Sequence, residues 1–93
     1  MMPRTMDSFE MRQTRLLLDH ISRLARGLPA GETNRDEVLR DIKEMESHLA
    51  IEPLSRAEIY RLRMHVWELH GSPFKALLIH QVAELGHTLG EAA

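Results

Sequence analysis

Residues 54–69, with the sequence LSRAEIYRLRMHVWEL, contain the clearest helix signal in the chain. Ser55 and Glu58 have the spacing of a capping box, in which a serine begins a helix and a glutamate follows three residues later. Leu54 can pack on Ile59 across that start as a hydrophobic staple. The apolar residues that follow recur at the spacing of one helical face: Ile59, Leu62, Val66 and Leu69. The stretch therefore predicts an amphipathic helix that begins after Ser55.

Another helix is predicted directly after this one, across a very tight turn. Gly71 can adopt the left-handed conformation that ends helices, and Ser72 followed by Pro73 is typical of a helix start. The apolar stripe of this helix consists of Phe74, Leu78, Val82, Leu85 and Leu89. Leu77 and Ile79 widen the stripe beyond what one neighbouring helix covers. The width predicts a central position or a place in a subunit interface.

The first half of the chain repeats this periodicity in two further stretches. Their apolar residues are Leu17, Ile21, Leu24 and Leu28 in the first, and Val38, Ile42, Met45 and Leu49 in the second. Asp7 is the predicted N-cap of the first helix, and Gly27 lies at its predicted end. Thr33 or Asn34 is the predicted N-cap of the second helix, because an acidic residue follows each of them after three positions. Pro53 is expected to stop that helix.

Charged residues are predicted to line the outer faces of these two helices. The first helix carries Arg12, Arg15, Asp19, Arg23 and Arg26 there, and the second is acidic, with Asp36, Glu37, Asp41, Glu44 and Glu46. This pattern is typical of solvated, weakly paired surface charge.

The length of 93 residues predicts a single domain, residues 1–93, with a flexible N-terminus (1–6) and a frayed C-terminus (90–93). Four amphipathic stretches without an alternating strand pattern predict an all-α fold, a four-helix bundle-like arrangement of two αα-hairpins. Folding at this length hides only about 60–65% of the surface of the unfolded chain, so we expect homodimerisation to complete the core.

Composition restricts the compartment and the kinds of partner. The net charge of −2, from 12 Lys and Arg against 14 Asp and Glu, lacks the basic excess that favours nucleic acid. The chain has no cysteine, which fits a reducing compartment. The first residues lack the apolar core of a signal peptide, and no apolar run approaches the roughly 18 residues of a membrane span. We therefore expect a cytoplasmic protein without a membrane partner.

Catalytic and metal-binding motifs are weak. The sequence has no phosphate-binding glycine loop, nucleophile elbow or His-Glu-x-x-His motif, which argues against an enzyme. His80, Glu84 and His87 would share one polar face of the last helix, but a single helix offers two or three ligands where zinc needs three or four with an ordered second shell. We expect a loose surface cluster there and no cofactor or metal.

The candidate functional residues lie beside the core stripe of the helix after Ser55. Arg56, Tyr60, Arg63, Trp67 and His70 recur at 4-3-4-3 spacing, displaced by about 100° from that stripe. Trp, Tyr and Arg are enriched in the hot spots of protein interfaces. The alternative is that the two aromatic side chains fill the flank of the core while the arginines reach water. The favoured interpretation is a non-catalytic regulator or adaptor that binds a partner protein through this face.

A dimeric helix-turn-helix regulator of DNA is the alternative function. Two helices joined at Gly71 have the order that this motif requires. The helix that would enter the major groove, however, offers only Lys75, Gln81 and two histidines among its apolar residues. DNA binding would therefore depend mostly on the arginines of the first helix, doubled in a dimer.

Overall fold

The computed structural model describes residues 8–52, 54–70 and 73–88, which form four helices. They are α1 (Ser8–Arg26), α2 (Arg35–Leu49), α3 (Arg56–Trp67) and α4 (Pro73–Thr88), and the described residues contain no strand. The predicted all-α fold is confirmed. None of these helices is both long and apolar enough to cross a membrane.

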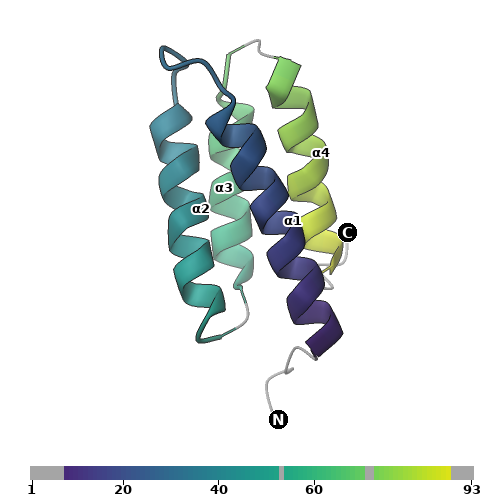
Figure 1. The fold of residues 1–93 in the computed structure, drawn as a ribbon. Helices are drawn as coiled ribbons and strands as arrows, with labels where there is room; N and C mark the ends of the chain where they lie inside the picture. The colour runs from purple at the N-terminus through teal and green to yellow at the C-terminus, as the bar shows by residue number, and fades with distance from the viewer. Residues whose placement is uncertain (1–7, 53, 71–72, 89–93) are drawn as a thin grey trace.

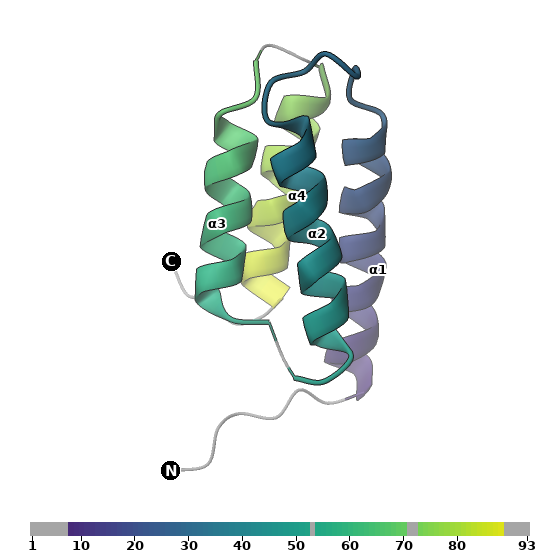
Figure 2. The same cartoon turned by 90° about the vertical axis from the view of Figure 1, so that its left-hand side faces the viewer.

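The helices form an up-and-down bundle in which each one packs against two neighbours (Figures 1 and 2). α1 lies between α2 and α4, and α3 lies between the same two helices on the other side of the bundle. The two predicted hairpins, α1–α2 and α3–α4, are therefore closed into one bundle by contacts between α2 and α3 and between α1 and α4. α1 and α3 occupy opposite corners, so their outer faces point to different sides of the molecule.

The predicted core stripes of α2 and α3 are confirmed. All eight residues are buried: Val38, Ile42, Met45, Leu49, Ile59, Leu62, Val66 and Leu69. Ser55 caps α3 as predicted, since its Oγ accepts a hydrogen bond from the Glu58 N–H at 3.2 Å. Leu54, next to this cap, is buried as well. The local start signal and the periodicity agree in this half of the chain, so the sequence is sufficient to place both helices.

The predicted stripe of α1 is confirmed at Ile21 and Leu28 and wrong at Leu17 and Leu24. The buried apolar positions are Leu18, Ile21, Ala25 and Leu28, together with the polar residues Thr14 and Ser22. Leu17 and Leu24 are only half-buried at the flank of the core. α1 packs against two neighbours, and the small side chain of Ala25 lets a helix approach more closely than a leucine does. The two buried hydroxyls are bonded locally: Thr14 Oγ1 donates to Glu10 O at 2.8 Å, and Ser22 Oγ accepts from Arg26 at 2.9 Å.

The α4 stripe agrees with the prediction at Leu78, Val82 and Leu85, which are buried. Phe74 is half-buried and packs on the core, where its ring lies near Gly27 at the end of α1. The position of α4 between α1 and α3 accounts for much of its broad stripe, because Ile79 also packs on the core. Leu77 remains half-exposed. Pro73 is the first residue of α4, as predicted, whereas Leu89, Gly71 and Ser72 lie outside the described residues.

The predicted start of α2 at Asn34 is confirmed, but the predicted capping box is wrong. Asn34 stands at the N-cap in a left-handed conformation, with φ 77°, and its side chain makes no capping hydrogen bond. The Asn34 amide instead donates to the backbone O of His65 at 2.9 Å, which ties the start of α2 to the end of α3. Asparagine tolerates positive φ better than most residues, so the chain uses it for both the turn and the tertiary contact. The predicted cap of α1, Asp7, and the predicted stop of α2, Pro53, lie outside the described residues.

Candidate functional site

Three large apolar side chains of α3 point away from the core. Tyr60 is 57% exposed, Met64 43% and Trp67 56%. Their i, i+4, i+7 spacing places them on one side of the helix, over about two turns. Arg56 and Arg63 belong to the same side, so these five residues together are called the α3 outer face. Trp67 and Tyr60 thus form a line of exposed apolar surface on α3 that no other described part of the bundle covers.

The structure separates the predicted site residues by their exposure. Arg56 is exposed at the first position of α3, Arg63 is half-buried, and His70 is exposed just beyond the end of the helix. Neither Tyr60 nor Trp67 fills the core, because more than half of each side chain is accessible. Their exposure favours the interface interpretation over the packing one, and their binding to a partner stays a prediction.

Lys75 of α4 holds the Trp67 end of this face. Its Nζ lies 5.8 Å from the centre of the Trp67 ring, within the range of a cation–π contact. The same Nζ donates a hydrogen bond to the backbone O of Leu69 at 2.8 Å. The ammonium therefore bridges the turn after α3 and restricts the position of the indole.

Met64 and Lys75 were not predicted as site residues from the sequence. Met64 follows Tyr60 by four residues and precedes Trp67 by three, so the spacing alone would have identified it. Lys75 gave no such signal, because its contact with Trp67 depends on how the chain turns between α3 and α4.

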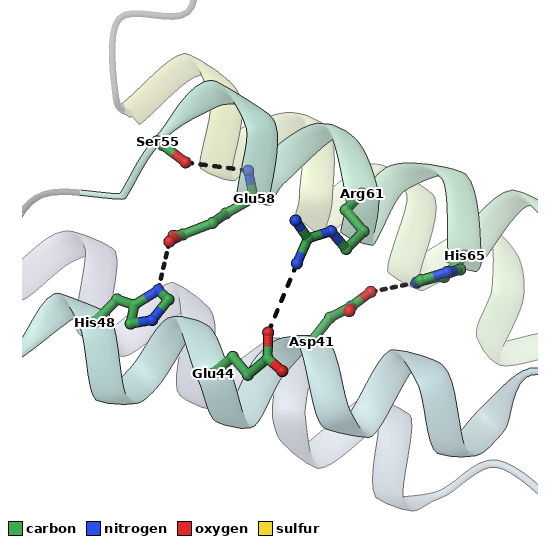
Figure 3. A network of polar contacts seen from close by, with 7 residues as sticks. All are labelled: Asp41, Glu44, His48, Ser55, Glu58, Arg61 and His65. Carbon is green, nitrogen blue, oxygen red and sulfur yellow. Dashed lines mark hydrogen bonds and ion pairs between the residues drawn. The ribbon is translucent and has the colours of Figure 1, made fainter.

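A ladder of three polar contacts joins α2 to α3 on another side of α3 (Figure 3). His48 Nδ1 donates to Glu58 Oε1 at 2.5 Å, and Arg61 Nη1 lies 3.6 Å from Glu44 Oε2. The third contact joins the His65 ring to Asp41, and because a carboxylate can only accept, His65 Nδ1 carries the hydrogen and donates to Oδ2. The contacts follow the antiparallel register of the two helices.

Asp41 corrects the prediction of a wholly solvated acidic face on α2. It is only 6% exposed, inside the α2–α3 seam, whereas the prediction placed it on the outer surface. Periodicity puts Asp41 next to buried Ile42, and its contact with His65 provides the partner that a buried carboxylate needs. His65 thus has a structural role, in which its Nδ1 is engaged with Asp41.

The described residues do not contain a group of three His, Cys, Asp or Glu side chains that could hold a metal ion. His80, Glu84 and His87 are exposed on α4. In the ladder between α2 and α3, His48 contacts Glu58 and His65 contacts Asp41. These two contacts lie at different positions along the helices (Figure 3).

The arginines of α1 are divided between paired and exposed groups. Arg23 forms an ion pair with Asp19 at 3.0 Å, and Arg26 bonds Ser22. Arg12 and Arg15 are exposed beside Met11 and Leu16, where they line an open depression. α1 therefore offers a second surface that mixes cations with apolar groups.

Comparison with known proteins adds no assignment to either surface: no protein family, curated protein or solved structure matches this chain.

Proposed function

We propose that this chain is a small, cytoplasmic, non-catalytic adaptor or regulator that binds a partner protein through the α3 outer face. The observation that carries the proposal is the exposure of Tyr60, Met64 and Trp67 in one line on a regular helix. Tryptophan and tyrosine are enriched among interface hot spots, whose truncation costs about 2 kcal/mol or more of binding free energy. A contiguous exposed apolar patch on a soluble protein marks an interaction site more often than an accident of composition.

The core supports this proposal because it is complete without the exposed aromatic residues. Among the described residues, sixteen apolar side chains from all four helices and their turns are buried, and the chain's single tryptophan is not one of them. Packing therefore does not account for Trp67. The contact with Lys75 also lowers the entropy cost of binding, since a side chain held in place loses less freedom when a partner covers it.

The arrangement of α3 and α4 favours protein binding over the helix-turn-helix alternative. In that motif the two helices cross at about 90–120°, which lets the second one enter the major groove. Here α3 and α4 run side by side as members of a bundle (Figure 2). The single lysine of α4 is also engaged with Leu69 and Trp67. DNA binding would fall to Arg12 and Arg15 of α1.

Trp67→Ala is expected to abolish capture of the partner protein while leaving the bundle folded. Tagged protein expressed in its native cells would be isolated with its bound proteins, and the captured proteins quantified by mass spectrometry. The matched control is Leu16→Ala, which truncates a side chain of similar exposure, 61%, on the opposite corner of the bundle. We expect Leu16→Ala to retain the partner. Equal loss with both variants, or equal retention, would contradict the proposal.

Homodimerisation is proposed as well, with α4 as the contact. Leu77 is 50% exposed there, whereas its neighbour Leu78 is buried in the core. Light scattering across micromolar to millimolar concentration is expected to give a mass above the 10.7 kDa of one chain. Leu77→Glu, which adds a charge to the contact, is expected to shift the mass toward the monomer. A monomer at every concentration would refute this proposal and leave the partner-binding proposal intact.

A further inference from the structure

Two further exposed residues of α3 extend the surface formed by the α3 outer face. Ala57 lies in the first turn of the helix, and Glu68 lies at its C-cap, where the backbone is still in the right-handed helical region. At about 100° per residue, both positions fall within about 40° of Met64, on the side away from the buried stripe. The exposed side of α3 therefore begins with a cation, Arg56, and ends with a carboxylate, Glu68. The three large apolar side chains of the face lie between these two charges.

The charges at the two ends complement each other in an antiparallel pairing of two copies. Arg56 precedes Leu62, in the middle of α3, by six residues, and Glu68 follows Leu62 by six. A second copy that runs antiparallel across a two-fold axis at the level of Leu62 therefore brings its Glu68 level with Arg56. The same holds in reverse, so the pairing allows two arginine–carboxylate contacts. A parallel pairing would instead place like charges together.

The apolar residues between these ends are complementary in size. Trp67 and Ala57 lie five residues on either side of Leu62, so in the same pairing the largest side chain of this surface comes level with the smallest. Tyr60 and Met64 lie two residues on either side, and a thioether makes favourable contacts with an aromatic ring. Large residues opposite small ones let two surfaces interdigitate. Size and charge thus favour the same register.

The other cations near this surface do not oppose the pairing. Arg61 and Arg63 come closest to the two-fold axis. The Arg61 guanidinium lies 3.6 Å from Glu44 of its own chain, and Arg63 is half-buried and has a partner within its own chain. Lys75 contacts the Trp67 ring and a backbone oxygen. The pairing therefore needs no counter-charge beyond Glu68.

We propose that a second copy of this chain covers the α3 outer face when the partner protein is absent, in an antiparallel pairing of α3 with α3, and that the partner displaces this copy. The competition rests on the proposed function, since both occupants use one face, whereas the pairing itself does not. One helix of each copy takes part, over about 18 Å from Arg56 to Glu68, so the contact is smaller than that of an obligate dimer. A contact of this size is weak enough for a partner to replace.

The test exchanges the two charges and measures self-association by sedimentation from micromolar to millimolar concentration. Every chain carries Leu77→Glu, so that the contact proposed on α4 does not contribute. With Arg56→Glu two carboxylates come level at each end of the pairing, and with Glu68→Arg two guanidinium groups do. Each variant is therefore expected to self-associate at least tenfold more weakly than the Leu77→Glu chain. A mixture of the two variants restores both pairs of opposite charges and is expected to associate within threefold of that chain.

Both substitutions are compatible with the helix, because an acidic residue is favourable in its first turn and a cation in its last turn. Circular dichroism checks that each variant is folded before association is compared. The matched control is Arg12→Glu in the Leu77→Glu chain, which makes the same change in charge on α1 and is expected to leave self-association within twofold. A Leu77→Glu chain that is monomeric at millimolar concentration, or a mixture that associates no better than its components, would overturn the pairing and leave the proposed function standing.

The competition is tested with the same two variants. Tagged Glu68→Arg chain is incubated with native-cell extract, and the captured protein that is lost with Trp67→Ala is quantified by mass spectrometry. Untagged Arg56→Glu chain pairs with the tagged chain, and is expected to lower this capture at least threefold more than an equal amount of untagged Glu68→Arg chain. An equal effect would overturn the competition while the pairing stands. If no captured protein depends on Trp67, the proposed function fails and sedimentation alone decides on the pairing.

Discussion

Leu62→Ala is expected to lower the free energy of unfolding by about 2–5 kcal/mol, because the truncation removes buried apolar surface and leaves a cavity. Leu62 is fully buried in the middle of α3. Total stabilities of small domains are typically about 5–15 kcal/mol, so the loss is a large part of the whole. Urea denaturation followed by circular dichroism measures it as a lower midpoint with an unchanged slope.

Trp67→Ala provides the comparison on the same helix. More than half of the Trp67 side chain is exposed, and its one described contact is with Lys75, so the expected loss of stability is about 1 kcal/mol or less. A tryptophan that filled the core would instead cost about 3–5 kcal/mol. Equal destabilisation by Leu62→Ala and Trp67→Ala would show that Trp67 belongs to the core, and the α3 outer face would lose its main residue.

His65→Ala is expected to destabilise the bundle by about 1–3 kcal/mol, because it leaves the buried carboxylate of Asp41 without its hydrogen-bond donor. Replacing both members with leucine removes the charge together with its partner. The double variant Asp41→Leu/His65→Leu is therefore expected to recover most of the loss. A cycle of the two single variants and the double variant, measured by urea denaturation, gives the interaction free energy.

The Glu44–Arg61 pair is the matched control in the same ladder. Its side chains are about half-exposed and their charged atoms are 3.6 Å apart, so Glu44→Ala is expected to cost no more than about 1 kcal/mol. If Glu44→Ala and His65→Ala have equal effects, burial does not govern the strength of these contacts. That result would contradict the structural role given to Asp41.

The sequence was sufficient for the parts of the fold in which local signals and packing agree. α2 and α3 each pack against two neighbouring helices. Even so, one apolar stripe, with 4-3-4 spacing in α2 and 3-4-3 spacing in α3, predicts their buried apolar residues correctly. In α1 the row of leucines at positions 16–18 offers several possible stripes, and the choice among them depends on how α2 and α4 are placed. Periodicity identifies a helix more reliably than it identifies which side of the helix is buried.

The polar contacts were the least predictable part. Asp41 resembles its acidic neighbours in sequence, and only the register between α2 and α3 brings it to His65. Asn34 bonds a residue that is 31 positions away, so its side chain was assigned wrongly to a local cap. For the candidate site, the spacing alone left two interpretations open, because an offset stripe of aromatic residues fits either the flank of the core or the surface. The exposure of Tyr60 and Trp67 favours the surface.

Photo-cross-linking at position 64 in native cells tests the central claim most directly. A photoreactive amino acid in place of Met64 would stand between Tyr60 and Trp67, where a bound partner must contact it. The α3 outer face predicts one discrete cross-linked protein from this position, and none from the same amino acid in place of Leu16. A cross-linked protein obtained from position 16 and not from position 64 would contradict the account and move the binding surface to α1.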